Sequence, residues 1–317
     1  MTGRDRFIAA LEHKPLKGLV PHFELVFYLT MEVLGKTHPE QRHFGQWHQM
    51  SVKERELQLQ DAAACFIGIA EKYRHDAIFV HPSVHDFNAV KRLLEIIRER
   101  TGNQYFIMMH GDSTFSIPDG GNMLDFSARM YEDAAALKDE AKRNTDARLA
   151  FCARFAGLGL LDGFALCSDY CFNSNPFFTV EQFEQFIVPY LRALIAGLRE
   201  MGFYSIKHTD GNIMPILDQI LDCRPDAIHS LDPQAGVDLK AVKAYCGDRV
   251  CLIGNVNCGL LQTGSVDEVR ADVLRSLNDG MPGGGYIFST SNCVYTGLPL
   301  ERYELMHDLW MQYGYTD

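Results

Sequence analysis

The sequence predicts a single-domain (β/α)8 barrel, and three observations carry this prediction. Eight short apolar runs are spread along the chain, and a helical pattern separates each run from the next. The runs do not alternate between apolar and polar residues, which is typical of parallel strands that are buried on both faces. The 317 residues are enough for eight strand–helix units, and no linker-like change in composition divides them. We therefore expect one domain over residues 1–317.

The main alternative fold is an open, doubly wound sheet. That fold usually carries a glycine-rich phosphate loop after an early strand, and the sequence contains neither GxGxxG nor GxxxxGK[ST]. This absence favours the barrel. The predicted strands are residues 19–27, 76–81, 104–110, 163–169, 203–208, 226–231, 250–254 and 285–290.

Helices are predicted between the strands from their periodicity and their caps. Thr2 is a candidate N-cap for the first helix, and Thr179 begins a capping box, TVEQ. A Gly/Pro/Asp-rich stretch, residues 117–122, is predicted to be a loop that covers an active site. The predicted helices cover residues 2–11, 48–74, 86–101, 130–158, 179–201, 213–223, 237–246, 265–278 and 299–313.

Charge and composition exclude several kinds of partner. The formal net charge is −11 without a basic block, so nucleic acid and acidic membrane surfaces are not expected partners. The apolar runs are too short to span a bilayer, and the first helix lacks the apolar centre of a signal peptide. The nine cysteines lack paired spacing, which favours reduced thiols. These features together predict a cytoplasmic protein.

Polar residues follow most of the predicted strands. In a barrel the carboxyl ends of all strands meet on one face, so these residues would converge there. The alternative is that each of them merely ends a strand or caps the next helix. The residues are Glu24, His81, His110, Asp112, Asp169, His208, Asp210, Asn255, Asn257, Asn292 and Cys293, with His229 inside the sixth strand.

The pair His208 and Asp210 is the most specific of these features. Imidazole nitrogen and carboxylate oxygen both bind zinc, and the thiol of Cys293 would supply a third ligand while one position stays open for substrate. The alternative is a core histidine with a helix-capping aspartate. We also assign His110 and Asp169 as candidate acid–base groups and His81, Asn255 and Asn292 as candidate substrate contacts.

Several stretches, taken together and in order, resemble the uroporphyrinogen decarboxylase superfamily. They include RDRFIAALEHK, TVEQFEQFIVPYLRALI, HTDGN, LIGNVN, GSVDEVRADV, PGGGYIFSTSN and PLERYELM. The resemblance spans nearly the whole chain and is strongest from Thr179 onwards. It implies a (β/α)8 barrel and one of two activities. Some members decarboxylate uroporphyrinogen without a cofactor. Others hold zinc and transfer methyl groups between a small substrate and the cobalt of a partner corrinoid protein.

One departure from the family patterns argues against a uroporphyrinogen decarboxylase, and a second argues against a methyltransferase that acts on a thiol. The decarboxylases carry an arginine-bearing stretch after the first strand, whereas this chain has HFELVFYLT with Glu24 and no arginine. The methylcobamide:coenzyme M methyltransferases bind zinc through His-x-Cys and a later Cys. Here Asp210 stands in the place of the first cysteine, and Cys293 lies near the second. An oxygen ligand leaves more charge on the metal, which suits an ether oxygen better than a thiol.

The resemblance therefore implies a zinc-dependent, corrinoid-dependent O-demethylase. Glu24 and His229 are further ligand candidates, Glu24 is alternatively a catalytic base, and Tyr170 is a candidate wall for an aromatic substrate. No Asp-x-His-x-x-Gly motif is present, so the corrinoid would arrive on a partner protein. A homodimer is compatible with the resemblance. The alternatives are a decarboxylase of a porphyrinogen or smaller acid, and a non-catalytic corrinoid- or metal-binding protein.

Overall fold

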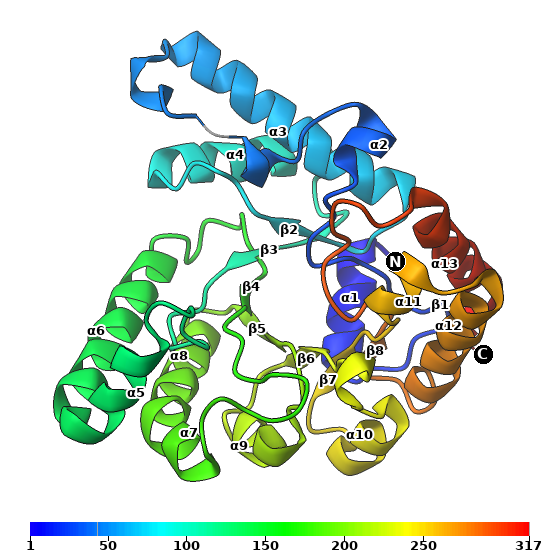
Figure 1. The fold of residues 1–317 in the computed structure, drawn as a ribbon. Helices are drawn as coiled ribbons and strands as arrows, with labels where there is room; N and C mark the ends of the chain where they lie inside the picture. Colours follow the sequence, from blue (N-terminus) through cyan, green and yellow to red (C-terminus); the bar gives the residue numbers. More distant parts are fainter. Residues whose placement is uncertain (43, 317) are drawn as a thin grey trace.

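The fold is organised around a curled sheet of seven parallel strands. The computed structural model describes residues 1–42 and 44–316. Figure 1 shows the strands curving around a centre with helices outside them. The sheet order follows the chain, from β2 to β8. The strands are β2 (Ala77–Val80), β3 (Phe106–His110), β4 (Gly163–Leu166), β5 (Tyr204–Thr209), β6 (Ala227–Ser230), β7 (Cys251–Ile253) and β8 (Tyr286–Ile287).

The prediction of eight strands is confirmed for seven of them. The predicted first strand, residues 19–27, is not a strand of this sheet; only β1 (Gly18–Leu19) forms there, and it pairs antiparallel with β9 (Tyr315–Thr316). One physical reason is Pro21, which has no N–H to give to a ladder. The segment still lies between the two sheet edges, because the Asp76 amide donates to the His22 carbonyl (2.7 Å) and the Phe288 amide to the Pro21 carbonyl (2.8 Å).

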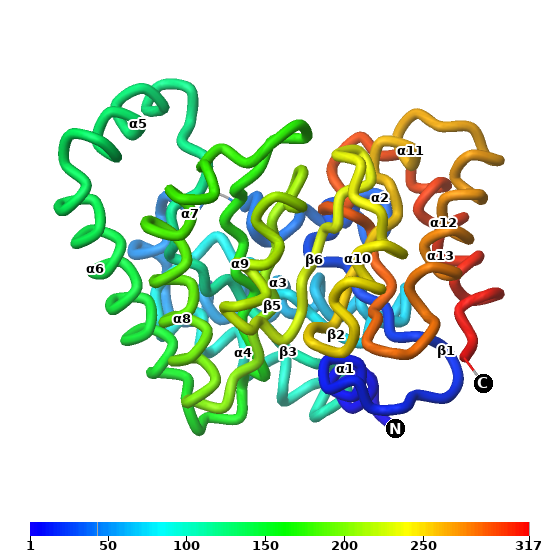
Figure 2. The backbone as a smooth tube through the Cα atoms, turned by 90° about the horizontal axis from the view of Figure 1, so that it is seen from below, coloured from blue at the N-terminus to red at the C-terminus, as the bar shows by residue number. Residues whose placement is uncertain are grey.

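Helices cover the outside of the sheet and one of its ends. Figure 2 places α1 on the opposite side of the molecule from α5 and α11. The Arg4 amide of α1 donates to the carbonyl of Gln104, just before β3, so α1 covers the end at which the strands begin. The helices are α1 (Gly3–Leu11), α2 (Thr30–Leu34), α3 (Val52–Lys72), α4 (Phe87–Thr101), α5 (Met123–Glu132), α6 (Ala134–Ala153), α7 (Val180–Phe186), α8 (Val188–Glu200), α9 (Leu217–Asp222), α10 (Leu239–Cys246), α11 (Cys258–Thr263), α12 (Val266–Gly280) and α13 (Leu300–Tyr313).

Two predicted helices are each divided in two. The range 130–158 contains the end of α5 and all of α6, because Asp133 ends one helix and its side chain caps the next at Ala136. The range 179–201 contains α7 and α8, which meet at Ile187 beside Pro189. Both predicted N-caps, Thr2 and Thr179, form capping boxes. In the described ranges, none of the helices combines the length and apolarity needed to cross a membrane.

Side-chain alternation divides the core into two layers. One layer fills the centre of the curled sheet, with Phe79, Met108, Ala165 and Ile206 among its buried members. The other lies between the sheet and the helices. Because alternate residues of a strand face opposite sides, His208 shares the central face with Ile206, whereas Lys207 faces the helices. The side chains of His208 and Lys207 are thus on opposite faces of the same strand.

Candidate metal centre

A histidine and two carboxylates meet at the carboxyl edge of the sheet. His208 is in β5, Asp210 follows the strand directly, and Asp169 follows the neighbouring β4. One ligand atom from each residue can be chosen so that all lie within 4.8 Å of one another. His208 Nε2 is 3.6 Å from Asp210 Oδ1 and 3.8 Å from Asp169 Oδ1. Two metal–ligand bonds of about 2.1 Å span up to about 4.2 Å, so these separations suit one shared ion.

Neighbouring groups hold both carboxylates in place. The amide of Asp210 donates to Asp169 Oδ1 (3.0 Å), and the Ser230 hydroxyl donates to Asp210 Oδ1 (2.8 Å). The side-chain amide of Asn292 donates to Asp210 Oδ2. Burial raises the pKa of Asp210; the charge of His208 opposes this shift, and the charge of Asp169 adds to it. A cation between the carboxylates would relieve this mutual repulsion.

A second histidine, His229 on β6, fixes the orientation of His208. The two Nδ1 atoms are 2.7 Å apart, and His229 Nε2 is 3.2 Å from the carbonyl oxygen of Thr290. Burial and the neighbouring His208 lower the pKa of His229 well below its usual value, so its ring is neutral. A carbonyl oxygen only accepts, which places the single proton of His229 on Nε2. His229 Nδ1 therefore accepts, and His208 Nδ1 is the donor.

This proton arrangement leaves His208 Nε2 as the atom that faces the two carboxylates. A nitrogen lone pair opposite two anionic oxygens is repulsive. Either a metal ion or a second proton on His208 satisfies the arrangement. A histidine whose other ring nitrogen is held by a hydrogen bond is also the usual form of a metal-ligating histidine. The donor set of one nitrogen and two oxygens fits zinc, so the residues present fit the predicted ion.

Glu24 is buried near His229, and the hydroxyl of Ser289 contacts both residues. Its Oε2 atom accepts hydrogen bonds from the Ser289 hydroxyl (3.1 Å) and from the amide (3.2 Å) and hydroxyl (2.5 Å) of Thr290. Its Oε1 atom is buried without a hydrogen-bond partner among the described residues. Burial raises the pKa of Glu24 to about 8, against the effect of these hydrogen bonds. Glu24 is therefore a protonated acid at neutral pH, and it lies outside the three-residue cluster.

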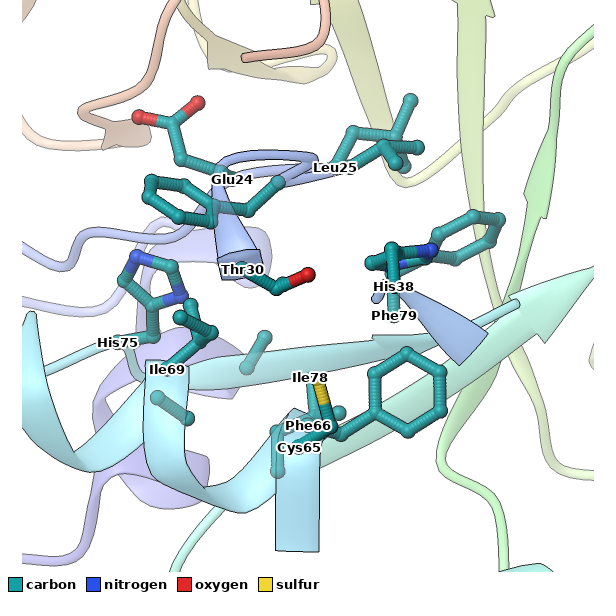
Figure 3. Close-up of a pocket in the computed structure, with 14 residues that line it drawn as sticks. Glu24, Leu25, Thr30, His38, Cys65, Phe66, Ile69, His75, Ile78 and Phe79 are labelled. Atoms are coloured by element: carbon teal, nitrogen blue, oxygen red, sulfur yellow. The ribbon is translucent and has the colours of Figure 1, made fainter. Parts of the chain in front are cut away.

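Glu24 also borders a small cavity that lies between the 24–30 segment, α3 and β2. Its volume is about 30 Å³, which is room for one or two water molecules. Figure 3 shows the carboxyl group of Glu24 pointing away from Cys65 and Phe66, which lie on the opposite side of the cavity. The cavity is therefore too small for a substrate, and the carboxyl group is not directed into it.

The structure regroups the predicted metal ligands. Asp169, predicted as an acid–base group, joins His208 and Asp210 in the cluster. His229, predicted as a ligand, has both ring nitrogens engaged and supports His208 instead. Cys293 lies outside the cluster. Burial raises the pKa of its thiol to about 11, with the Asp210 carboxylate adding to the effect.

The other predicted residues fall into two groups. His81 and His110 lie at strand ends on the same edge as the cluster. Burial lowers the pKa of His110 to about 4 and also lowers that of His81, whose Nδ1 atom has no partner among the described residues. Tyr170 and Asn255 are fully buried. The role of both residues as substrate contacts stays a prediction.

The partners of these two buried residues explain their roles. The Tyr170 hydroxyl contacts Thr114 (2.6 Å) on the helix-facing side of the sheet. The Asn255 side-chain amide donates to the carbonyl of Leu231 (2.6 Å), and its oxygen accepts from Arg275 (3.0 Å). Both side chains thus hold the fold together. Asn292, also predicted as a substrate contact, positions Asp210.

Sequence reasoning missed the residue beside the cluster, Lys207, which is completely buried. The available signal was a lysine inside an apolar run, because lysine is almost never fully buried unless it is paired. The supporting hydroxyls of Ser230 and Ser289 were also missed, and no sequence signal distinguishes them from ordinary strand residues.

The fold and the cluster define a class of α/β proteins that keep a functional site at the carboxyl edge of a parallel sheet. Within that class the chain belongs to the uroporphyrinogen decarboxylase family, whose sequence model matches residues 89–313. A comparison with curated protein sequences gave no significant match.

Solved structures support the fold. A methyltransferase from Methanosarcina mazei superposes with a TM-score of 0.74 at 17% sequence identity, covering 99% of each chain. A GH5_18 protein from Streptomyces cattleya in complex with GlcNAc superposes with a TM-score of 0.54 at 11% identity, covering 92% of this chain and 79% of that one. At these identities the comparisons show a common fold and no more.

Proposed function

We propose that this protein is a zinc-dependent methyltransferase of the uroporphyrinogen decarboxylase family. In this proposal the methyl group comes from a small donor in which it is bound to oxygen, such as a methoxylated aromatic compound. The acceptor is the cobalt of a corrinoid carried by a partner protein. The observation that carries the proposal is His208 Nε2, which is oriented by His229 and faces the carboxylates of Asp169 and Asp210.

The oxygen-rich donor set supports a methyl–oxygen substrate. His208, Asp169 and Asp210 would hold the zinc, which when bound supplies Lewis-acid stabilisation of the charge that develops on a leaving oxygen. Carboxylate ligands leave more positive charge on a metal than thiolates do. The fold shared with a methyltransferase from Methanosarcina mazei supports the reaction type.

The residues around the cluster have separate tasks in this proposal. His229 keeps the Nδ1 proton of His208 in place, and Asn292 and Ser230 keep Asp210 aimed at the cluster. During transfer the methyl–oxygen bond would break with its electron pair going to oxygen, and a cobalt(I) corrinoid, when bound, would supply the electron pair that accepts the methyl group. The donor leaves as an alkoxide or phenolate, which is then protonated from water.

A metal analysis tests the proposal. Protein purified without chelator should contain about one zinc per chain, and His208→Ala should lose it. The control is His48→Ala, because His48 is exposed on the surface. The same preparation should methylate free cob(I)alamin when it is supplied with methoxylated aromatics. Wild-type protein that binds no zinc would overturn the proposal. Release of CO₂ from a porphyrinogen or smaller acid, without methyl transfer, would establish the decarboxylase alternative in its place.

A further inference from the structure

A fully buried ion pair lies next to the cluster, on the helix-facing side of the sheet. Lys207 Nζ is 2.9 Å from Asp112 Oδ2, and the two side chains are 0% and 1% exposed. The ammonium group also donates to the carbonyl oxygens of Leu166 (3.1 Å) and Ser168 (2.9 Å). An ammonium group has three donors, so all of them are used.

Asp112 is equally well satisfied. Its Oδ1 atom accepts from the amides of Ser113 (2.8 Å) and Thr114 (2.9 Å) and from the Thr114 hydroxyl (2.7 Å). Its Oδ2 atom accepts from the amide of Ser168 (2.9 Å) in addition to Lys207. Burial acts to raise the pKa of Asp112, but Lys207 and these donors hold it below its usual value, so the pair stays ionised at neutral pH.

These bonds join three chain segments that the site needs together. Asp112 follows β3, Ser168 follows β4, and Lys207 is in β5. The Tyr170 ring lies over the ammonium group, 4.0 Å from Nζ to the ring centroid, and closes the pair off from water. The Tyr170 amide in turn donates to the Thr209 hydroxyl (3.0 Å). Asp169 therefore lies between two residues whose backbones are tied to this network.

Stability alone does not account for the pair. Removing two charges from water is expensive, and well-packed apolar residues of similar volume often replace a buried pair without loss of stability. The flanking positions Leu166 and Ile228 of the same layer are already apolar. The hydrogen bonds from the pair to Ser168 hold that residue close to the strand of His208. Apolar residues could not make these hydrogen bonds.

We propose that Lys207 and Asp112 are positioning residues that fix Asp169 relative to His208 and so preorganise the three ligands. Lys207 directly precedes His208 in β5, and Ser168, which both members of the pair bind, directly precedes Asp169. The inference rests on the proposed metal-dependent function, because the cluster that it preorganises is the proposed zinc site.

The test compares apolar replacements of two ion pairs: the fully buried Lys207–Asp112 pair and the partly buried Arg98–Asp162 pair, whose carboxylate also binds Arg4. The Lys207→Met/Asp112→Leu variant removes the pair beside the cluster. The matched control, Arg98→Met/Asp162→Leu, removes the pair in which Arg98 lies 2.7 Å from Asp162, just before β4 begins and therefore at the opposite end of the sheet. Zinc affinity is measured by chelator competition, ligand geometry by the visible absorption of the cobalt(II) form, and folding by thermal unfolding of the metal-free proteins.

We expect the Lys207/Asp112 variant to bind zinc about 10- to 100-fold more weakly, with a changed cobalt(II) spectrum. The Arg98/Asp162 control should keep the zinc affinity and the cobalt(II) spectrum of the wild-type protein, whatever its melting temperature. If the double variant does not fold, Asp112→Glu keeps the charges and moves the carboxylate by one methylene, and it should weaken zinc binding in the same direction. Wild-type affinity in the folded variants would overturn this inference alone. No zinc or cobalt binding by the wild-type protein would overturn the proposed function and this inference with it.

Discussion

The Nδ1 atoms of His208 and His229 lie 2.7 Å apart, and this contact determines which nitrogen of His208 is presented to the carboxylates. The contact exists because β5 and β6 are paired with His208 opposite His229. His208 Nδ1–H donates to His229 Nδ1, and His229 Nε2–H donates to the carbonyl oxygen of Thr290. In the proposed zinc site, His229 would therefore hold the ligand His208 in place, as the hydrogen-bond partners of ligating histidines do at many metal sites.

The first prediction concerns that support. Replacing His229 by Phe keeps the ring volume but removes the acceptor for His208 Nδ1, so we expect zinc affinity to fall about 10- to 100-fold. His229→Asn is the control, since its amide oxygen can occupy the place of Nδ1, and it should bind within a few-fold of wild type. Chelator competition measures both variants. Equal affinity of the Phe and Asn variants would contradict the assigned role.

The second prediction is a pH dependence that comes from Glu24. Its pKa in the folded protein is about 8, against 4.5 for an ordinary glutamate. At a pH between these two pKa values, Glu24 has lost its proton in the unfolded chain but keeps it in the folded chain. Unfolding thus releases a proton, and rising pH destabilises the fold until Glu24 ionises as well. Below pH 4.5 both states carry the proton and the effect vanishes.

Glu24→Gln, which imitates the protonated acid, should remove this dependence. We expect it to be more stable than wild type at about pH 9 by on the order of 4 kcal/mol, and equally stable at about pH 4. Urea unfolding at a series of pH values measures the difference. Glu301→Gln, an exposed glutamate at the start of α13, is the control and should leave the slope unchanged. A wild-type slope in Glu24→Gln would show that Glu24 is ionised when folded.

The third prediction concerns the glycine after Asp210. Gly211 has a φ of +81°, and an added Cβ would lie 2.4 Å from the Cys171 carbonyl oxygen and 2.6 Å from that of Phe172. Backbone carbonyls cannot move aside as a flexible side chain does, so Gly211→Ala should destabilise the protein by roughly 3 kcal/mol or more and should also weaken zinc binding by displacing Asp210.

Gly202 offers a matched control for that substitution. Its φ is +83°, but no atom lies within 4 Å of an added Cβ. Gly202→Ala should therefore show only the cost of the left-handed backbone, about 1–2 kcal/mol, with unchanged zinc affinity. Urea unfolding and chelator competition separate the two variants. Similar losses in both would mean that the close carbonyls near Gly211 do not matter.

Much of the fold could be predicted because buried parallel strands leave a plain pattern of apolar runs. Seven runs became strands of one sheet in chain order. The run at 19–27 did not: it meets the sheet at isolated bridges such as His22 with Phe288, and Pro21 has no N–H to extend that pairing. The division of the 130–158 helix at Asp133 also escaped prediction, since an aspartate inside a helical pattern is not by itself a break.

The site was predictable as far as it depends on strand ends. His208 and Asp210 stand two residues apart at one end, and Asp169 stands at the neighbouring one, so their convergence follows from the strand order. The roles of His229 and Lys207 depend on cross-strand register and on which face of the strand a side chain takes. Neither the register nor the face is fixed by spacing along the chain. The contact of His229 with His208 and the buried position of Lys207 could therefore not be predicted.

The last prediction separates an oxygen-rich site from a thiolate site. Cys293 lies outside the cluster, and its thiol pKa is raised to about 11, mainly by burial. Cys293→Ala should therefore change zinc affinity by no more than a few-fold, and the cobalt(II) form of the wild-type protein should show no sulfur-to-metal charge-transfer band. The comparison variant is Asp169→Ala, which removes a proposed ligand and should weaken binding strongly. A charge-transfer band that disappears in Cys293→Ala would make Cys293 a ligand and would shift the expected substrate from a methyl–oxygen compound toward a thiol.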